Sequence, residues 1–68
     1  MQVNINIVKG EDEIADFDLP MSDVNSFLDL IKRLGWHDPD TGTHYRVSEI
    51  QLTSPTTIWI ELEEGESE

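Results

Sequence analysis

Carboxylate side chains recur at every second position in parts of this chain, which is the spacing of side chains on one face of a β-strand. Asp16 and Asp18 alternate with apolar residues, and Glu61 and Glu63 follow Trp59 in the same way. Carboxylates with this spacing lie about 6.5–7 Å apart, close to the roughly 7 Å between successive phosphates of an extended nucleic-acid strand. We therefore expect these five residues to form a partner-binding face that suits a basic groove.

Trp59 lies among carboxylates on the same strand face. An outward tryptophan in such a place is typical of an apolar anchor in a protein interface. Packing under the chain end or against a second copy is the alternative. A solvated face that is acidic for solubility is the competing interpretation of the whole set.

A second group of residues has the chemistry of a metal site. His37, Asp38, Asp40 and His44 lie in one turn-rich segment, and Asp38-x-Asp40-x-Gly42 resembles half of a calcium loop. The distal glutamate of such a loop is missing, although the two histidines could complete a zinc or nickel site. Because Asp-Pro-Asp-x-Gly is also a common turn string, a metal-binding module using the 37–44 loop is kept as an alternative, and no cofactor is predicted.

Catalysis is not predicted. The sequence contains neither a nucleophile elbow nor a glycine-rich phosphate loop. A 68-residue chain rarely encloses a pocket of about 300 Å³. We expect the protein not to be an enzyme.

The charge balance limits the classes of partner. Fifteen acidic and four basic side chains give a formal net charge of −11. Phosphates of nucleic acid and anionic membrane surfaces would be repelled, whereas basic protein surfaces would be attracted in a fast and salt-sensitive way. The chain has no cysteine, no signal-peptide pattern at its start and no apolar run near the roughly 20 residues that span a bilayer. These features predict a cytoplasmic protein that binds neither nucleic acid nor membrane directly.

Hydrophobic periodicity predicts the elements that must position these residues. Period-2 alternation predicts strands over 1–8, 13–19 and 57–63, with a turn at 9–12. A stripe at i, i+3, i+4 and i+7 predicts a helix over about 23–34, with Ser22 as its N-cap, Gly35 as its left-handed end and Trp36 as an apolar contact. A further strand over 45–52 changes phase, which predicts a β-bulge near Ser48 and Glu49.

The order β-β-α-β-β predicts an α+β fold: one antiparallel sheet of about four strands with a single helix packed on one face. Residues 1–63 would form one small domain, and residues 64–68 would form a flexible acidic tail. The sheet face turned away from the helix would carry Asn4, Asn6, Asp16, Asp18, Trp59, Glu61 and Glu63.

In size, acidity and lack of cysteine, the chain is similar to the small DNA-mimic and anti-defence proteins of phages and mobile elements. No motif supports the resemblance, so no residue roles follow from it. It implies an inhibitor or decoy that occupies a basic groove of a nucleic-acid enzyme. A non-catalytic structural or adaptor module is the alternative, acting as a homodimer through a sheet edge or through the face around Trp59.

Overall fold

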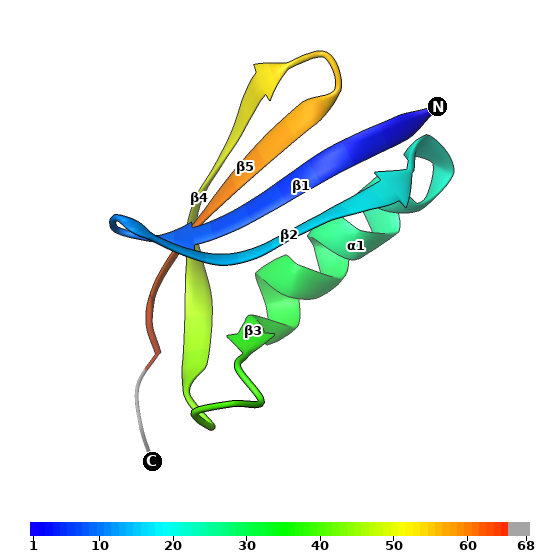
Figure 1. Ribbon diagram of the computed structural model, residues 1–68. Helices are drawn as coiled ribbons and strands as arrows, with labels where there is room; N and C mark the ends of the chain where they lie inside the picture. Colours follow the sequence, from blue (N-terminus) through cyan, green and yellow to red (C-terminus); the bar gives the residue numbers. More distant parts are fainter. Residues whose placement is uncertain (66–68) are drawn as a thin grey trace.

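The computed structural model describes residues 1–65, which fold into one curved sheet and one helix (Figure 1). Alternating segments form strands, and the 3.6-residue stripe forms the helix. The element order is β-β-α-β-β-β. The elements are β1 (Gln2–Lys9), β2 (Asp12–Pro20), α1 (Met21–Leu34), β3 (Trp36–His37), β4 (His44–Ser54) and β5 (Thr57–Glu64).

The sheet corrects the predicted architecture. Its strand order is β2-β1-β5-β4-β3, and β1 runs parallel to β5, while all other neighbouring pairs are antiparallel. The prediction of an antiparallel sheet of about four strands is therefore wrong, because the sheet is mixed and has five strands. Parallel neighbours need a crossover connection, and here the segment containing α1 supplies it. The alternation of apolar and polar residues predicts which face of the sheet a residue lies on, but it does not predict which strands pair with each other.

The core lies between α1 and the concave side of the sheet. Ile5 and Ile7 of β1 and Ile60 of β5 are fully buried, which explains why these two strands occupy the centre. The remaining buried members of the core are Val3, Val24, Ile31, Ile58 and Leu62. The helix stripe predicted from the sequence thus packs on the predicted inward faces of the strands.

The ends of α1 differ in how well the sequence predicted them. The helix begins at Met21, with Pro20 at the N-cap position and no side-chain hydrogen bond there, so Ser22 is not the cap. Gly35 has a φ of 75° and its N–H donates to the carbonyl of Ile31 at 2.8 Å. A Cβ at Gly35 would overlap the carbonyl oxygen of Tyr45, so both backbone angle and space require glycine here.

Aromatic side chains bring the two edges of the sheet together. Trp36 does not only follow the helix: it begins β3, is paired with Tyr45, and stacks on Phe17 of β2 with ring centroids 6.4 Å apart. Phe17 in turn meets Phe27 of α1 edge-on at 5.5 Å. The curved sheet is therefore a half-barrel, fastened between β2 and β3 by aromatic contact. The predicted loop 37–44 is shorter than expected because His37 pairs with His44.

The β-bulge predicted in β4 is confirmed. Val47 lies opposite Leu62 and Glu49 lies opposite Glu61, so Ser48 is the additional residue. Glu64, the first residue of the predicted tail, is the last residue of β5. Residues 66–68 of that tail lie outside the described residues. Within the described chain, α1 has neither the length nor the apolar character to cross a lipid bilayer.

Candidate functional site

The convex side of the sheet carries the predicted binding residues, and we call it the outer face. Strand register fixes its layout: Trp59 lies between Gln51 of β4 and Asn6 of β1, and Asn6 lies opposite Asp16 of β2. The outer face includes Asn4, Asn6, Asp16, Asp18, Arg46, Glu49, Gln51, Thr57, Trp59, Glu61 and Glu63, together with the buried Val8 beside Glu61. All five predicted site residues lie on it, but they are divided between β2 and β5.

Asp16 and Asp18, the aspartate pair, are held by one amide. Asn4 Nδ2 donates to Asp16 Oδ1 at 2.8 Å and to Asp18 Oδ1 at 3.1 Å. Asn6 Nδ2 donates to Asn4 Oδ1 at 2.6 Å and so orients that amide. The two bonded oxygens, both within reach of one nitrogen, are closer together than the 6.5–7 Å expected from strand spacing alone. The pair is a dense anionic spot on an exposed edge strand.

Glu49 and Glu61, the glutamate pair, lie directly opposite each other on β4 and β5. Like charges in this position are destabilising by a few tenths of a kcal/mol to about 1 kcal/mol. Gln51 Nε2 donates to Glu49 Oε2 at 2.6 Å. Sequence reasoning missed Glu49. The signal that could have found it is the bulge, because an additional residue at Ser48 moves Glu49 onto the face of Glu61.

Glu63 differs from Glu61 although it lies two residues away on the same face. Arg46 Nη2 is 3.0 Å from Glu63 Oε2, so a cation of the neighbouring strand compensates this carboxylate. Trp59 is 38% exposed, which leaves a substantial part of its ring surface open to contact. The outer face therefore has an exposed aromatic centre with differently compensated acids around it.

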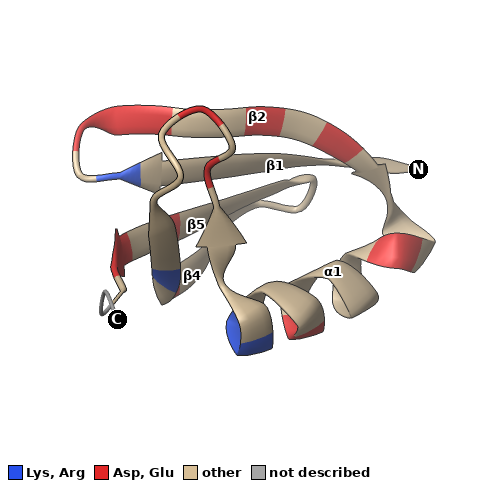
Figure 2. Ribbon diagram, turned by 90° about the horizontal axis from the view of Figure 1, so that it is seen from below, with Lys and Arg blue, Asp and Glu red and all other residues tan. Residues whose placement is uncertain are grey.

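The predicted site is thus two clusters rather than one array. One strand, β1, lies between β2 and β5, which places the strands of the two clusters about 10 Å apart. Figure 2 shows acidic positions along β2, in the β1–β2 turn and in the segment between β3 and β4. Basic positions lie instead at the C-terminal end of α1, on β4 and at the end of β1 (Figure 2).

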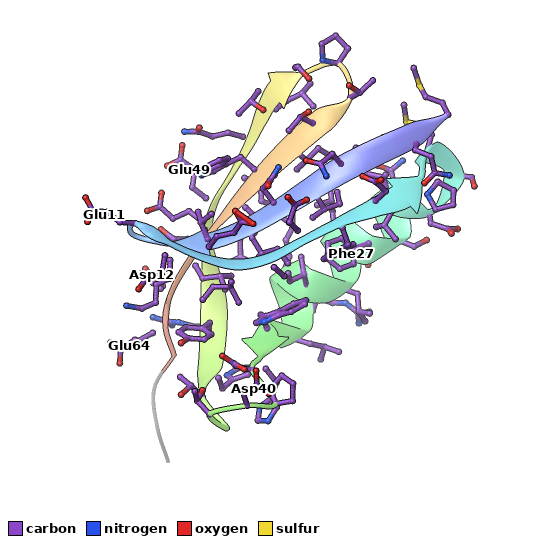
Figure 3. The ribbon with its side chains drawn as sticks, in the orientation of Figure 1. Glu11, Asp12, Phe27, Asp40, Glu49 and Glu64 are labelled. Atoms are coloured by element: carbon purple, nitrogen blue, oxygen red, sulfur yellow. The ribbon has the colours of Figure 1, made fainter. Side chains whose placement is uncertain are left out.

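The 37–44 loop is built by backbone turns. Asp38 Oδ1 accepts from the N–H of Asp40 at 2.9 Å, and the Asp38 carbonyl accepts from the N–H of Gly42 at 2.8 Å. His44 Nε2 lies 2.7 Å from the carbonyl oxygen of Leu34, at the end of α1. Asp40 lies at the tip of this loop (Figure 3). In residues 1–65, no three histidine, aspartate or glutamate side chains gather closely enough to hold a metal ion.

A cavity of about 280 Å³ lies where α1 ends against β4. Its apolar lining comes from Leu34 and Val47. The other lining residues are Lys32, Arg33, Gly35, His44, Arg46 and Glu63. Ion pairs already engage two of these cations, since Arg33 Nε lies 3.7 Å from Asp29 and Arg46 contacts Glu63. The cavity therefore has a mixed lining, in which two apolar side chains lie among polar ones and ion pairs engage two of the three cations.

Comparison of the chain with known protein families, curated proteins and solved structures found no match to any of the three. Interpretation of the site therefore depends on its geometry and charge. The polar groups of the outer face are mainly carboxylates and carboxamides, with Arg46 paired to Glu63 and Trp59 as the exposed aromatic side chain. What these groups can do chemically is accept hydrogen bonds from cationic donors and cover apolar surface.

Proposed function

We propose that this protein is a non-catalytic binder of basic protein surfaces, acting as an inhibitor or decoy in a basic groove of a nucleic-acid enzyme. The observation that carries the proposal is the aspartate pair, whose carboxylates are both held by the amide of Asn4 at 2.8 and 3.1 Å. A face that is acidic only for solubility has no need of carboxylates fixed in one place.

Fixing the carboxylates before binding favours affinity. Association costs free energy for every side chain that must be ordered at the interface, about 0.5–1.5 kcal/mol for a flexible one. Hydrogen bonds from Asn6 to Asn4, and from Asn4 to both aspartates, already order these side chains in the free protein. Arginine or lysine side chains of a partner would then meet a ready acceptor site, and charge-assisted hydrogen bonds are stronger than neutral ones.

Two further features support the same function: the net charge acts on a partner at long range, and Trp59 acts at contact. A net charge of −11 on 68 residues accelerates encounter with a cationic groove. Trp59, 38% exposed, then supplies the apolar anchor that charged contacts lack. The dense aspartate pair supports binding to a concentrated basic site, more than it supports a copy of regular phosphate spacing.

The proposal is tested by capture followed by quantitative binding. The tagged protein is exposed to bacterial lysate at low salt and eluted with a salt gradient, and the eluted proteins are identified by mass spectrometry. Each captured protein is then purified and titrated in turn. We expect one nucleic-acid enzyme, displaced both by salt and by duplex DNA, because its basic groove would be the shared site.

Matched charge reversals locate the interface. The double variant Asp16→Lys, Asp18→Lys should weaken binding of that enzyme about tenfold or more. The control Glu11→Lys, Asp12→Lys makes the same change of net charge at the β1–β2 turn and the first residue of β2. Both residues are exposed, and Figure 3 places them away from α1. Equal losses from the two variants would reduce the effect to net charge. Capture of only untagged copies that survive high salt would instead support the homodimer.

A further inference from the structure

Most of β4 has a strand on one side only. Residues 45–54 pair with β5, whereas on the other side β3 reaches only His44 and Tyr45. Within the described residues, the stretch from Arg46 to Ser54 is therefore an open edge of the sheet. An open edge presents a row of unpaired N–H and C=O groups, which is a template for another extended segment.

The concave side of this edge is apolar and incompletely covered. Ile50 and Leu52 lie on the same side as the core, opposite Ile60 and Ile58 of β5. Leu52 is nevertheless 69% exposed, and the tip of the β4–β5 hairpin lies away from α1 (Figure 1). Burying such a side chain on a partner would stabilise a complex, because it removes apolar surface from water.

The convex side of the same edge is anionic. Glu49 is on β4 itself, and Glu61 lies directly beside it on β5. Figure 3 shows Glu49 at the margin of the molecule, on the side away from α1. A cation placed next to Glu49 would relieve the repulsion within the glutamate pair, since opposite charges on neighbouring strands attract.

We propose that an extended segment of the basic partner adds to this open edge as a sixth strand. Its alternate side chains are basic on the convex side, beside Glu49, and apolar on the concave side, against Ile50 and Leu52. Main-chain hydrogen bonds supply affinity and the two faces supply specificity, as in other cases of strand addition. The inference rests on the proposed function and names the form in which the partner binds.

The cavity at the end of α1 extends the recognition. It lies where the open edge meets the helix, and Leu34 and Val47 form its apolar lining. An apolar side chain of the added strand beside Val47 points to the concave side and enters this recess. Its volume of about 280 Å³ is enough for one large side chain but small for a separate ligand.

Charge favours a basic partner over a second copy. Two chains of −11 repel each other as they approach. Edge-to-edge pairing of two β4 strands would also bring two glutamate pairs into one continuous sheet. A segment with alternating basic and apolar residues meets neither obstacle.

The test uses two capped synthetic hexapeptides of three lysines and three valines, one alternating and one with the lysines in a block. Titration calorimetry compares their affinities, and amide hydrogen exchange locates binding. We expect the alternating peptide to bind at least about tenfold more tightly, because only it meets both faces at once, and to protect amides of residues 46–54. Leu52→Lys should abolish this preference, and Leu30→Lys, at a side chain 47% exposed on α1, should leave it intact.

Each other outcome overturns the inference in a distinguishable way. Equal, salt-sensitive binding of both peptides would contradict strand addition and leave the proposed function standing. Protection confined to β2 would place the ligand on the aspartate pair instead. Binding of neither peptide would remove the edge site, and the proposed function would then depend on capture and the Asp16, Asp18 variant alone. A different outcome is that the protein sediments as a dimer, with the amides of residues 46–54 protected in the absence of peptide. That result would show that a second copy of the protein binds the open edge.

Discussion

Two pairs of acids on the outer face differ in their surroundings. The aspartate pair lies on β2 beside β1, which supplies the amide of Asn4 as a shared donor. The glutamate pair lies across β4 and β5, where the residue opposite Glu61 is another carboxylate. The comparison teaches that the neighbouring strand decides whether a carboxylate meets a hydrogen-bond donor or another anion across the sheet.

The edges of the sheet show a matching contrast. On β2, Phe17 contacts both Phe27 of α1 and Trp36 of β3, so this edge is fastened to the rest of the molecule. On β4, Leu52 is 69% exposed and the edge is open over most of its length. Within the described chain, the outward main-chain groups of β2 are also unpaired, because β2 is the terminal strand, but aromatic side chains hold this edge against α1 and β3. Among the same residues, the edge of β4 lacks such contacts at Leu52 and offers a partner an exposed apolar side chain as well.

The largest expected effect comes from loosening the fixed edge. Phe27→Ala should lower the free energy of unfolding by about 3 kcal/mol, because it removes the edge-on contact with Phe17 and leaves a cavity beside Val24 and Ile31. A domain of this size has only a few kcal/mol to lose. Urea denaturation followed by tryptophan fluorescence measures the change.

Leu52→Ala is the matched control at the open edge, and it should change stability by no more than about 0.5 kcal/mol because Leu52 is mostly solvated. Similar losses for the two variants would mean that both edges contribute equally to the fold. That result would remove the contrast on which the strand-addition inference is built.

A smaller effect is expected from the donor of the aspartate pair. Asn4→Ala removes the amide that bonds both carboxylates and should cost about 1–2 kcal/mol. Part of the loss should be recovered in 1 M salt, where the repulsion between Asp16 and Asp18 is screened. The exposed helix residue Asn25 gives the control Asn25→Ala, which we expect to be near neutral at both salt concentrations. If the loss of stability in Asn4→Ala is the same at both salt concentrations, the amide does not act through the carboxylates.

Alternation within each strand was enough to predict which residues share a face. It placed Asp16, Asp18, Trp59, Glu61 and Glu63 on one side of the sheet, and the change of phase between Val47 and Ile50 predicted the bulge. It could not predict that β1 would run parallel to β5, because the choice of neighbour depends on tertiary packing of the most apolar strands in the centre. The two-residue β3 was missed because it is too short to show a period.

The composition of the candidate site was predicted only in part for the same reason. Glu49 and Arg46 come from a strand whose bulge changes which residues face outward, and their partners Glu61 and Glu63 are set by register. The role of Asn4 depends on its position opposite Asp18, which is a pairing between strands. Sequence spacing identified the acids of β2 and β5, and strand pairing added Glu49 and determined the partner of each carboxylate.

The smallest expected effect tests the comparison most directly, because it uses two glutamates of one strand. Glu61→Gln should raise the free energy of unfolding by about 0.5 kcal/mol, since it removes the repulsion with Glu49. Glu63→Gln should lower it by up to about 0.5 kcal/mol, since it removes the contact with Arg46. Both substitutions reduce the net negative charge by one, so the general relief of repulsion is common to them and the difference in sign is local. Urea denaturation at low salt should resolve the two signs, and 1 M salt should bring both values toward zero. If both variants gain equally at low salt, the net charge governs stability and the glutamate pair is no different from the other carboxylates of the outer face.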